Sequence, residues 1–496
     1  MARPTTLGEL RKSGYRPRPV KDELRENLMA RLKARQPVFE GIVGYDATVL
    51  PQVINAILSR HNIILLGLRG QAKTRILRAL AGLLDDYIPV VAGSEINDDP
   101  FAPISKHARA LVASKGDATP IEWISREARY NEKLATPDVS IADLIGDVDP
   151  IKAASRKLTF ADEEVIHFGI IPRTNRGIFA INELPDLQPR IQVGLLNILE
   201  EKDIQIRGFP VRMPLDIMLC FSANPEDYTN RGSIITPLKD RIESQVLTHY
   251  PLTLEEARRI TDQEAWTKRS GPAVEVPPFV RDAIEQIAFE ARQSEFVDQG
   301  SGVSARMTIA IYENVLSNAE RRCLALGQPR TTLRLLDLQA AIPAISGKLE
   351  LVYEGEQEGG EKVATRLVGA AARKIFERHF PPAIERAAKQ PKRNQPQTGK
   401  PKGEGIYKPI IDHFAAGHRL ELSDSLSDCE VEQRLETVPG LKALVREHLP
   451  EAGGGALSAA MELVLEGLHQ SSLLAKEDLD RGVLYTDMLG ALYEGG

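Results

Sequence analysis

The sequence is poor in cysteine, with only Cys220, Cys323 and Cys429 spread over 496 residues. Such isolated cysteines form neither a Cys-x-x-Cys metal or redox pair nor the disulfide framework of a small secreted protein. The chain also lacks an apolar signal segment near Met1 and any hydrophobic run long enough to cross a bilayer. These absences predict a cytoplasmic protein in a reducing compartment, without a membrane span.

An excess of charge of one sign is also absent, because 63 Lys and Arg residues face 69 Asp and Glu residues, for a net charge of -6. A general nucleic-acid-binding surface is basic, so we expect no direct contact with nucleic acid. The local exception is residues 389–402, KQPKRNQPQTGKPK, which mix basic residues with proline and contain no apolar residue. This composition predicts a solvated linker, with a polybasic membrane or nucleic-acid contact as the minor alternative.

Signature motifs of several enzyme classes are missing. The chain contains no Gly-x-Ser-x-Gly elbow and no His-Glu-x-x-His helix. His413 and His418 lie near Asp412, but a metal site requires more ligands than these. No serine hydrolase or zinc protease is therefore predicted.

The most informative segment that is present is residues 61–74, HNIILLGLRGQAKT. The apolar run 63–66 has the length of a buried strand, and the sequence RILRALAGLL that follows the loop has helical spacing. A glycine-rich loop between strand and helix directs backbone N–H groups and the helix dipole at an anion. The segment therefore predicts a phosphate-binding loop, with an ordinary glycine turn as the alternative.

The loop reads Gly-x-x-x-x-Ala-Lys-Thr, with Ala72 where the strict P-loop has its last glycine. We expect Lys73 to reach the β- and γ-phosphates of ATP and the Thr74 hydroxyl to ligate Mg²⁺. The predicted nucleotide-binding loop comprises Gly67, Leu68, Arg69, Gly70, Gln71, Ala72, Lys73, Thr74 and Arg75.

A second apolar run, GIFAINE at 177–183, ends on Asn182 and Glu183. Nucleotide hydrolases place two carboxylates here, the first for the Mg²⁺ shell and the second to orient the attacking water. Glu183 fills the second role, whereas Asn182 brings a neutral amide to the metal position. An amide can hold a Mg²⁺-bound water but adds no negative charge, so we expect weaker metal binding and slower hydrolysis.

A third apolar run within 216–227 brings Asn224 out at its end, and Asp240 and Arg241 then precede another short strand-like run. The order of P-loop, acidic strand end, asparagine strand end and Asp-Arg resembles the AAA+ ATPases. Within them it resembles the clade of the MoxR proteins and the magnesium chelatase I subunit. The resemblance extends from about Phe39 to the helices before the basic linker.

Several details resemble this clade in particular, beginning with the Ala-Lys-Thr end of the P-loop. Residues 143–154 and 166–184 look like the helix-2 insertion and the approach to the Walker B strand. In that approach Asn175, Arg176 and Gly177 match an Asn-Arg-Gly motif. Residues 203–214 alternate like a two-stranded hairpin and match the hairpin before sensor 1. In the family, both insertions project toward partners.

The resemblance also implies site roles. Asn224 matches sensor 1, and Arg306 matches sensor 2 of the lid. Arg241 matches the arginine finger, which acts on the nucleotide of a neighbouring subunit, with Arg231 as a second candidate. Val43, Gly44 and Tyr45 resemble the segment that folds over the adenine, and a hydrophobic turn is the equal alternative.

The implied fold is an α/β P-loop AAA+ core with a parallel sheet sandwiched by helices, followed by an all-helical lid and a mostly helical C-terminal region. The expected divisions are an N-terminal arm (1–37), the core (38–250), the lid (251–387), a basic proline-rich linker (388–405) and the C-terminal region (406–496).

The implied function is ATP hydrolysis, with Mg²⁺, in a homo-oligomeric and hexameric ring. Its turnover would remodel a partner that contains a von Willebrand A domain. The alternatives are a magnesium chelatase I subunit proper and a nucleotide-gated scaffold that hydrolyses little because of Asn182. An enhancer-binding transcription activator is disfavoured, because no Gly-Ala-Phe-Thr-Gly-Ala loop lies between Lys73 and Glu183.

Overall fold

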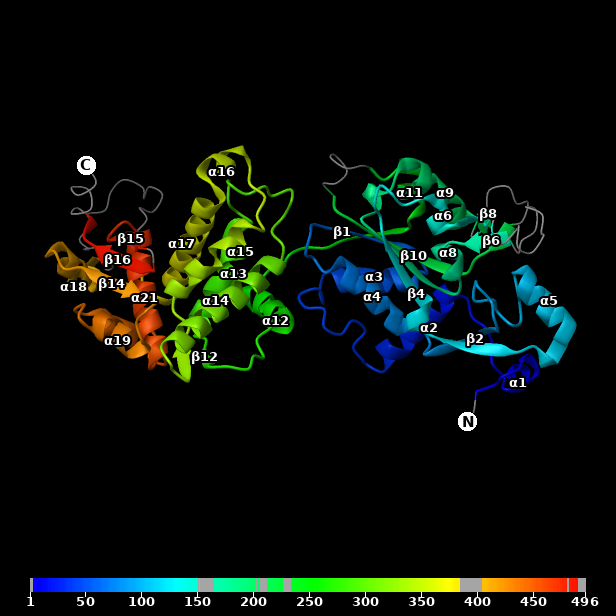
Figure 1. The fold of residues 1–496 in the computed structure, drawn as a ribbon, viewed down its shortest axis with the longest axis horizontal. Coiled ribbons are helices and arrows are strands. Elements are labelled where there is room, and N and C mark those ends of the chain that lie inside the picture. Colours follow the sequence, from blue (N-terminus) through cyan, green and yellow to red (C-terminus); the bar gives the residue numbers. More distant parts are fainter. Residues whose placement is uncertain are drawn as a thin grey trace, which may run out of the picture. The chain divides into compact units, whose positions relative to one another are not determined.

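Figure 1 shows the computed structural model, in which the chain divides into two compact units, Met1–Tyr250 and Pro251–Gly496. Arg231 and most of the predicted basic linker lie outside the residues that the structure describes. The described residues are 3–149, 151, 165–201, 203–205, 212–225, 233–383, 404–479 and 481–488.

The first unit alternates strands and helices. Its helices are α1 (Leu7–Lys12), α2 (Val20–Lys33), α3 (Val49–Leu58), α4 (Lys73–Ala79), α5 (Lys106–Lys115), α6 (Ile141–Leu144), α8 (Ile170–Arg173), α9 (Pro189–Glu200) and α11 (Thr236–Arg241). Its strands are β1 (Ile63–Leu66), β2 (Tyr87–Val91), β3 (Ile121–Ser125), β4 (Tyr130–Leu134), β5 (Gly146–Val148), β6 (Ile166–Phe168), β7 (Gly177–Asn182), β8 (Asp203–Gln205), β9 (Arg212–Pro214), β10 (Ile217–Ala223) and β11 (Ser244–Leu247).

The central sheet of this unit has the order β11-β1-β10-β7-β4, and every neighbouring pair is parallel. The carboxyl ends of all five strands therefore lie at one edge. The register pairs Leu66 with Ala223 and Phe221 with Ile181, so β1, β10 and β7 end side by side. The three predicted strand-end motifs meet at this edge.

Helices cover both faces of the sheet, because successive residues of a buried strand point to opposite sides. On one face, Ile63, Leu65 and Ile178 pack in a core with α2, α3 and α4. On the other face, alternate residues such as Phe179 and Phe221 pack with α8, α9 and α11. The expected parallel sheet between two helical layers is confirmed. The hairpin predicted at 203–214 is also present, as the antiparallel pair β8 and β9.

The α2 helix is tied to the sheet by a buried ion pair between Glu23 and Arg129, which are 2% and 1% exposed. The two nitrogens of the Arg129 guanidinium lie 2.8 and 2.6 Å from the two Glu23 oxygens, and its Nε donates to the Arg176 carbonyl. Gly177 is required here, since an added Cβ would lie 2.1 Å from the Arg129 carbonyl oxygen. The Asn-Arg-Gly segment is therefore a buried junction between α2, β4 and β7.

The second unit is largely helical. Its helices are α12 (Leu254–Glu264), α13 (Pro278–Ala291), α14 (Arg306–Ala325), α15 (Ile342–Ser346), α16 (Tyr353–Glu358), α17 (Gly360–His379), α18 (Glu404–Ala415), α19 (Asp428–Glu436), α20 (Leu441–His448) and α21 (Gly455–Gln470). Its strands are β12 (Ala273–Glu275), β13 (Arg330–Thr332), β14 (Leu420–Ser423), β15 (Ala475–Leu479) and β16 (Gly482–Thr486).

The second unit also contains two small sheets. One lies in the lid, which is therefore not all-helical as expected, and the other lies in the C-terminal region, where no sheet was expected. Strands β12 and β13 pair in parallel, and β14, β16 and β15 form an antiparallel sheet in that order. Each of these strands has only three to five residues. So short a run shows too little alternation to be recognised from sequence.

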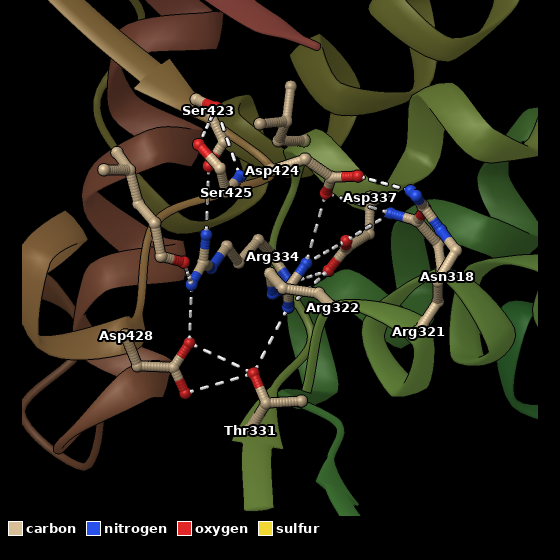
Figure 2. Close-up of polar contacts among 12 residues, drawn as sticks. Asn318, Arg321, Arg322, Thr331, Arg334, Asp337, Ser423, Asp424, Ser425 and Asp428 are labelled. Carbon is tan, nitrogen blue, oxygen red and sulfur yellow. Dashed lines mark hydrogen bonds and ion pairs between the residues drawn. The ribbon is translucent and has the colours of Figure 1, made fainter. Parts of the chain in front are cut away.

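A buried charge cluster joins the predicted lid to the C-terminal region (Figure 2). Arg322 of α14 pairs with Asp337, and both side chains are at most 1% exposed. Arg334 donates to the Asp428 carboxylate at 2.8 Å and to the Leu426 carbonyl at 2.7 Å. Residues 426–428, which lead into α19, are therefore fastened to the segment that follows β13.

We expect Arg334→Ala to lower the free energy of unfolding of the second unit by about 3 kcal/mol, because it leaves Asp428 without its cation. Hydrogen exchange should show faster opening of α19 and α21, with the first unit unchanged. Arg366→Ala is the matched control, since Arg366 is 56% exposed in its 3.5 Å ion pair with Glu358. Equal effects of the two substitutions would contradict the stabilising role of the cluster.

Candidate nucleotide-binding site

The loop after β1 adopts two left-handed backbone conformations. Gly70 has φ 74° and Ala72 has φ 56°, directly before α4 begins at Lys73. The left-handed region costs an L-residue with a Cβ about 1–2 kcal/mol, and glycine avoids this cost. Ala72 therefore keeps the backbone geometry that a glycine would adopt at this position.

Lys73 lies folded against the loop and is 7% exposed. Its Nζ donates to the Gly67 carbonyl and, at 3.2 Å, to the Leu68 carbonyl. An ammonium group held among neutral carbonyl oxygens gains a stronger partner when an anion arrives. The side chain is thus placed at the mouth of the loop, where phosphates would bind.

The loop is supported from behind by the residues that follow β11. Thr248 Oγ1 donates to Gln71 Oε1 at 2.7 Å, and the Tyr250 hydroxyl donates to the Arg69 carbonyl at 2.9 Å. A Cβ at Gly67 would lie 1.9 Å from Thr248 Oγ1, which explains the glycine there. Our sequence reasoning missed Thr248 and Tyr250, because only the sheet order shows that β11 lies beside β1.

Tyr45 contributes to the same support. It is 5% exposed, and its hydroxyl lies 3.0 Å from the Gln71 carbonyl oxygen and 2.6 Å from that of His249. Burial raises the pKa of Tyr45 to about 12, which keeps the hydroxyl protonated as a donor. Val43 and Gly44 are partly buried beside it. An adenine contact of these three residues stays a prediction.

Three polar side chains and one backbone N–H group meet where β7 and β10 end. Thr74 Oγ1 donates to Asn182 Oδ1 at 3.2 Å, and Ser222 Oγ donates to the same oxygen at 3.1 Å. The Glu183 backbone N–H donates to Ser222 Oγ at 3.3 Å. The first helical turn after the loop is thereby connected to both neighbouring strands.

Glu183 and Asn224 complete this edge. Glu183 is partly buried and left-handed, with φ 55° and ψ 52°, and Asn224 follows the last residue of β10. Strained backbone is uncommon for a residue with a side chain and is concentrated at functional sites. The structure thus brings Lys73, Thr74, Asn182, Glu183 and Asn224 to one edge of the sheet.

Arg241 lies at the opposite edge. It ends α11 just before β11, and β11 runs parallel to β1 with Ser244 paired to Ile63. Its guanidinium pairs with Glu200 at 2.7 Å and donates to the Pro237 carbonyl at 3.0 Å. Arg241 therefore lies near the amino end of β1, whereas the predicted nucleotide-binding loop follows the carboxyl end of that strand.

Arg306 belongs to the second unit, where it is the exposed first residue of the 20-residue helix α14. Its backbone N–H donates to Ser304 Oγ at 3.1 Å. The sensor 2 role of Arg306 stays a prediction.

The oxygen atoms near the loop are suitable ligands for Mg²⁺. This ion prefers oxygen ligands and is commonly held by one or two protein groups together with water and substrate phosphates. The Thr74 hydroxyl donates its proton to Asn182, so its lone pairs remain available to a metal ion. Glu183 follows β7, which is separated from β1 by β10 in the sheet. In the described part of the chain, no group of three or more His, Cys, Asp or Glu residues could hold a metal by itself. Thr74 and Glu183 therefore fit a Mg²⁺ ion that arrives with the nucleotide.

Within the ranges that the structure describes, every helix is too short or too polar to pass through a bilayer.

Comparison with known proteins found partial relatives. No family model matches the chain. The magnesium-chelatase subunit ChlI of Cyanidium caldarium is 26% identical over 211 residues, which are 41% of this chain and 55% of that protein. Over those residues the chain is similar to a magnesium chelatase I subunit, a member of the AAA+ clade that the motifs indicated. The resemblance inferred from the motifs is confirmed at that level.

Other relatives match the chain over shorter stretches. The hydrogenase transcriptional regulatory protein HoxA of Cupriavidus necator is 26% identical over 164 residues, 32% of this chain and 30% of that protein. The archaeal Lon protease of Thermococcus kodakarensis is 29% identical over 168 residues, 30% of this chain and 25% of that protein. The chain thus spans about half or less of the length of the curated relatives that it matches.

Solved structures of AAA+ proteins were also found. Subunits BchI and BchD of magnesium chelatase give a TM-score of 0.33 at 20% identity, covering 64% of this chain and 98% of that one. NtrX from Brucella abortus in complex with ATP gives a TM-score of 0.40 at 13% identity, covering 71% and 66%. Both TM-scores are too low to support any statement about the function of this chain.

Proposed function

We propose that this AAA+ protein binds ATP with Mg²⁺ at residues 67–75 and hydrolyses it. The observation that supports this best is the meeting of Lys73, Thr74, Glu183 and Asn224 at one edge of a parallel sheet. Phosphate groups bind at the start of a helix after such a strand, and the carboxyl edge of a parallel sheet is where ligands collect.

In the proposed reaction each residue acts on the triphosphate. Lys73 exchanges its carbonyl partners for the β- and γ-phosphates, and Asn224 positions the γ-phosphate. Glu183 orients a water whose oxygen attacks the γ-phosphorus. The bond from that phosphorus to the bridging oxygen breaks, and ADP, phosphate and a proton are released. A Mg²⁺ ion held by Thr74 and Glu183 would neutralise charge on the phosphates.

The position of Arg241 supports an oligomer as the active form. A guanidinium at the far edge of the sheet serves only a nucleotide bound to another copy of the chain, where it stabilises the transition state. We therefore propose a homo-oligomeric ring, of six subunits as in the clade that the sequence resembles.

The process that ATP turnover drives is proposed from the resemblance to the clade. Turnover remodels a partner protein that contains a von Willebrand A domain, or, in a narrower version, serves magnesium insertion as the I subunit of a chelatase. The neutral Asn182 favours a second candidate, a nucleotide-gated scaffold that binds ATP and hydrolyses it slowly. Turnover of the purified protein separates the second candidate from the first.

The testing experiment measures Mg²⁺-dependent phosphate release across a range of protein concentrations, together with the mass of the assembly in ATP. We expect turnover per subunit to rise with concentration as rings form. ATP binding without turnover at any concentration would support the scaffold. Absence of both binding and turnover would contradict the proposed function.

A further inference from the structure

Ser222 is a buried polar residue that our sequence reasoning did not single out. It is 0% exposed in β10 and makes two contacts with the end of β7. Its Oγ accepts from the Glu183 N–H at 3.3 Å and donates to Asn182 Oδ1 at 3.1 Å. Because the Glu183 N–H occupies an acceptor position of this hydroxyl, the hydroxyl proton points at Asn182.

These contacts determine which end of the Asn182 amide faces inward. An amide oxygen has two lone pairs, and the Thr74 and Ser222 hydroxyls take both of them. The Asn182 side chain is 9% exposed, and its Nδ2 has no hydrogen-bond partner in the part of the chain that the structure describes. This NH₂ group reaches solvent, so it is available to donate to an anion that enters the site.

We propose that Asn182 donates through Nδ2 to a phosphate oxygen of the bound nucleotide and that Ser222 is the positioning residue that orients it. The inference rests on the proposed function, because it concerns the same nucleotide site. It assigns position 182 to the phosphates, whereas the sequence pattern predicted a role for Asn182 in the Mg²⁺ shell.

The consequence concerns the dependence of binding on metal. A carboxylate beside a triphosphate repels it unless a cation lies between them, and an amide donor attracts it directly. The site should therefore retain nucleoside triphosphate when Mg²⁺ is removed, better than a site with aspartate at this position.

The test is the affinity for a non-hydrolysable ATP analogue, measured by calorimetry with saturating MgCl₂ and again with EDTA. In the wild type we expect EDTA to weaken binding by less than about tenfold, and in Asn182→Asp by about a hundredfold, owing to the added negative charge. In Ser222→Ala we expect the affinity in EDTA to fall about tenfold, since the amide is no longer held. The quantity compared between proteins is the ratio of the affinity with MgCl₂ to the affinity with EDTA.

Two matched controls carry the same substitutions elsewhere in the first unit. Asn197→Asp changes an exposed asparagine of α9, and Ser244→Ala changes a serine at the opposite end of the sheet. Both should behave as the wild type.

The inference would be overturned if EDTA weakened binding by the same factor in the wild type and in Asn182→Asp. It would also be overturned if Ser222→Ala bound the analogue in EDTA as tightly as the wild type. Failure of the wild type to bind the analogue in either condition would instead overturn the proposed function.

Discussion

Replacing Lys73 by alanine is expected to weaken ATP binding by at least about a hundredfold, because the phosphates lose a charge-assisted donor within the loop. The Nζ group already lies against the carbonyl oxygens of Gly67 and Leu68 and needs little movement to reach a phosphate. Lys73 is only 7% exposed, and this burial also protects its interaction with phosphate from screening by salt.

The measurement for Lys73→Ala is the dissociation constant for ATP by calorimetry, with hydrogen exchange of α4 to show that the loop still folds. Lys106→Ala is the matched control, because Lys106 is likewise the first residue of a helix, α5, yet is exposed and remote in sequence from the loop. We expect this control to bind ATP as the wild type does. An unchanged affinity in Lys73→Ala would refute the assignment of this loop to the phosphates.

Replacing Arg241 by alanine is expected to lower ATP turnover by about a thousandfold while leaving ATP affinity within about twofold. The separation of the two effects follows from the proposed action in trans, in which Arg241 contacts the nucleotide of a neighbouring subunit only in the transition state. Its ion pair with Glu200, whose carboxylate side chain is 54% exposed, is too weak to prevent this use.

Glu200→Ala provides the matched control for Arg241→Ala, since it removes the same ion pair but keeps the guanidinium. We expect its turnover to stay within a few-fold of the wild type. Mixing Arg241→Ala with Glu183→Gln subunits should restore part of the activity, because mixed rings contain sites with one intact copy of each group. Equal losses in Arg241→Ala and Glu200→Ala, or a large loss of ATP affinity in Arg241→Ala, would contradict action in trans.

Much of the fold could be predicted, because the signals are local. The strand, loop and helix around residues 63–79, the strands that end at Asn182 and Ala223, and the hairpin at 203–214 are all present. Each is marked by an apolar run, by alternation or by helical spacing within a few residues. The two small sheets of the second unit were missed, because their strands are short and pair with partners far away in the chain.

The site was predictable only in part, for a related reason. Lys73, Thr74, Glu183 and Asn224 follow apolar runs in a recognisable order, so the sequence alone identified them as candidates. Thr248, Tyr250 and Ser222 carry no such pattern. They lie within or shortly after strands whose neighbours are known only once the sheet order β11-β1-β10-β7-β4 is known.

The sequence by itself determined the local chemistry of this chain: a glycine-rich loop predicted to bind phosphate, a glutamate and an asparagine at strand ends, and a neutral residue at position 182. Tertiary structure alone decided how these groups face one another. It placed Arg241 at the edge away from the loop, and it directed two hydroxyl protons at the oxygen of Asn182. The physical reason is that residue type and spacing set which interactions are available, whereas strand order and register set which partners come within hydrogen-bonding distance.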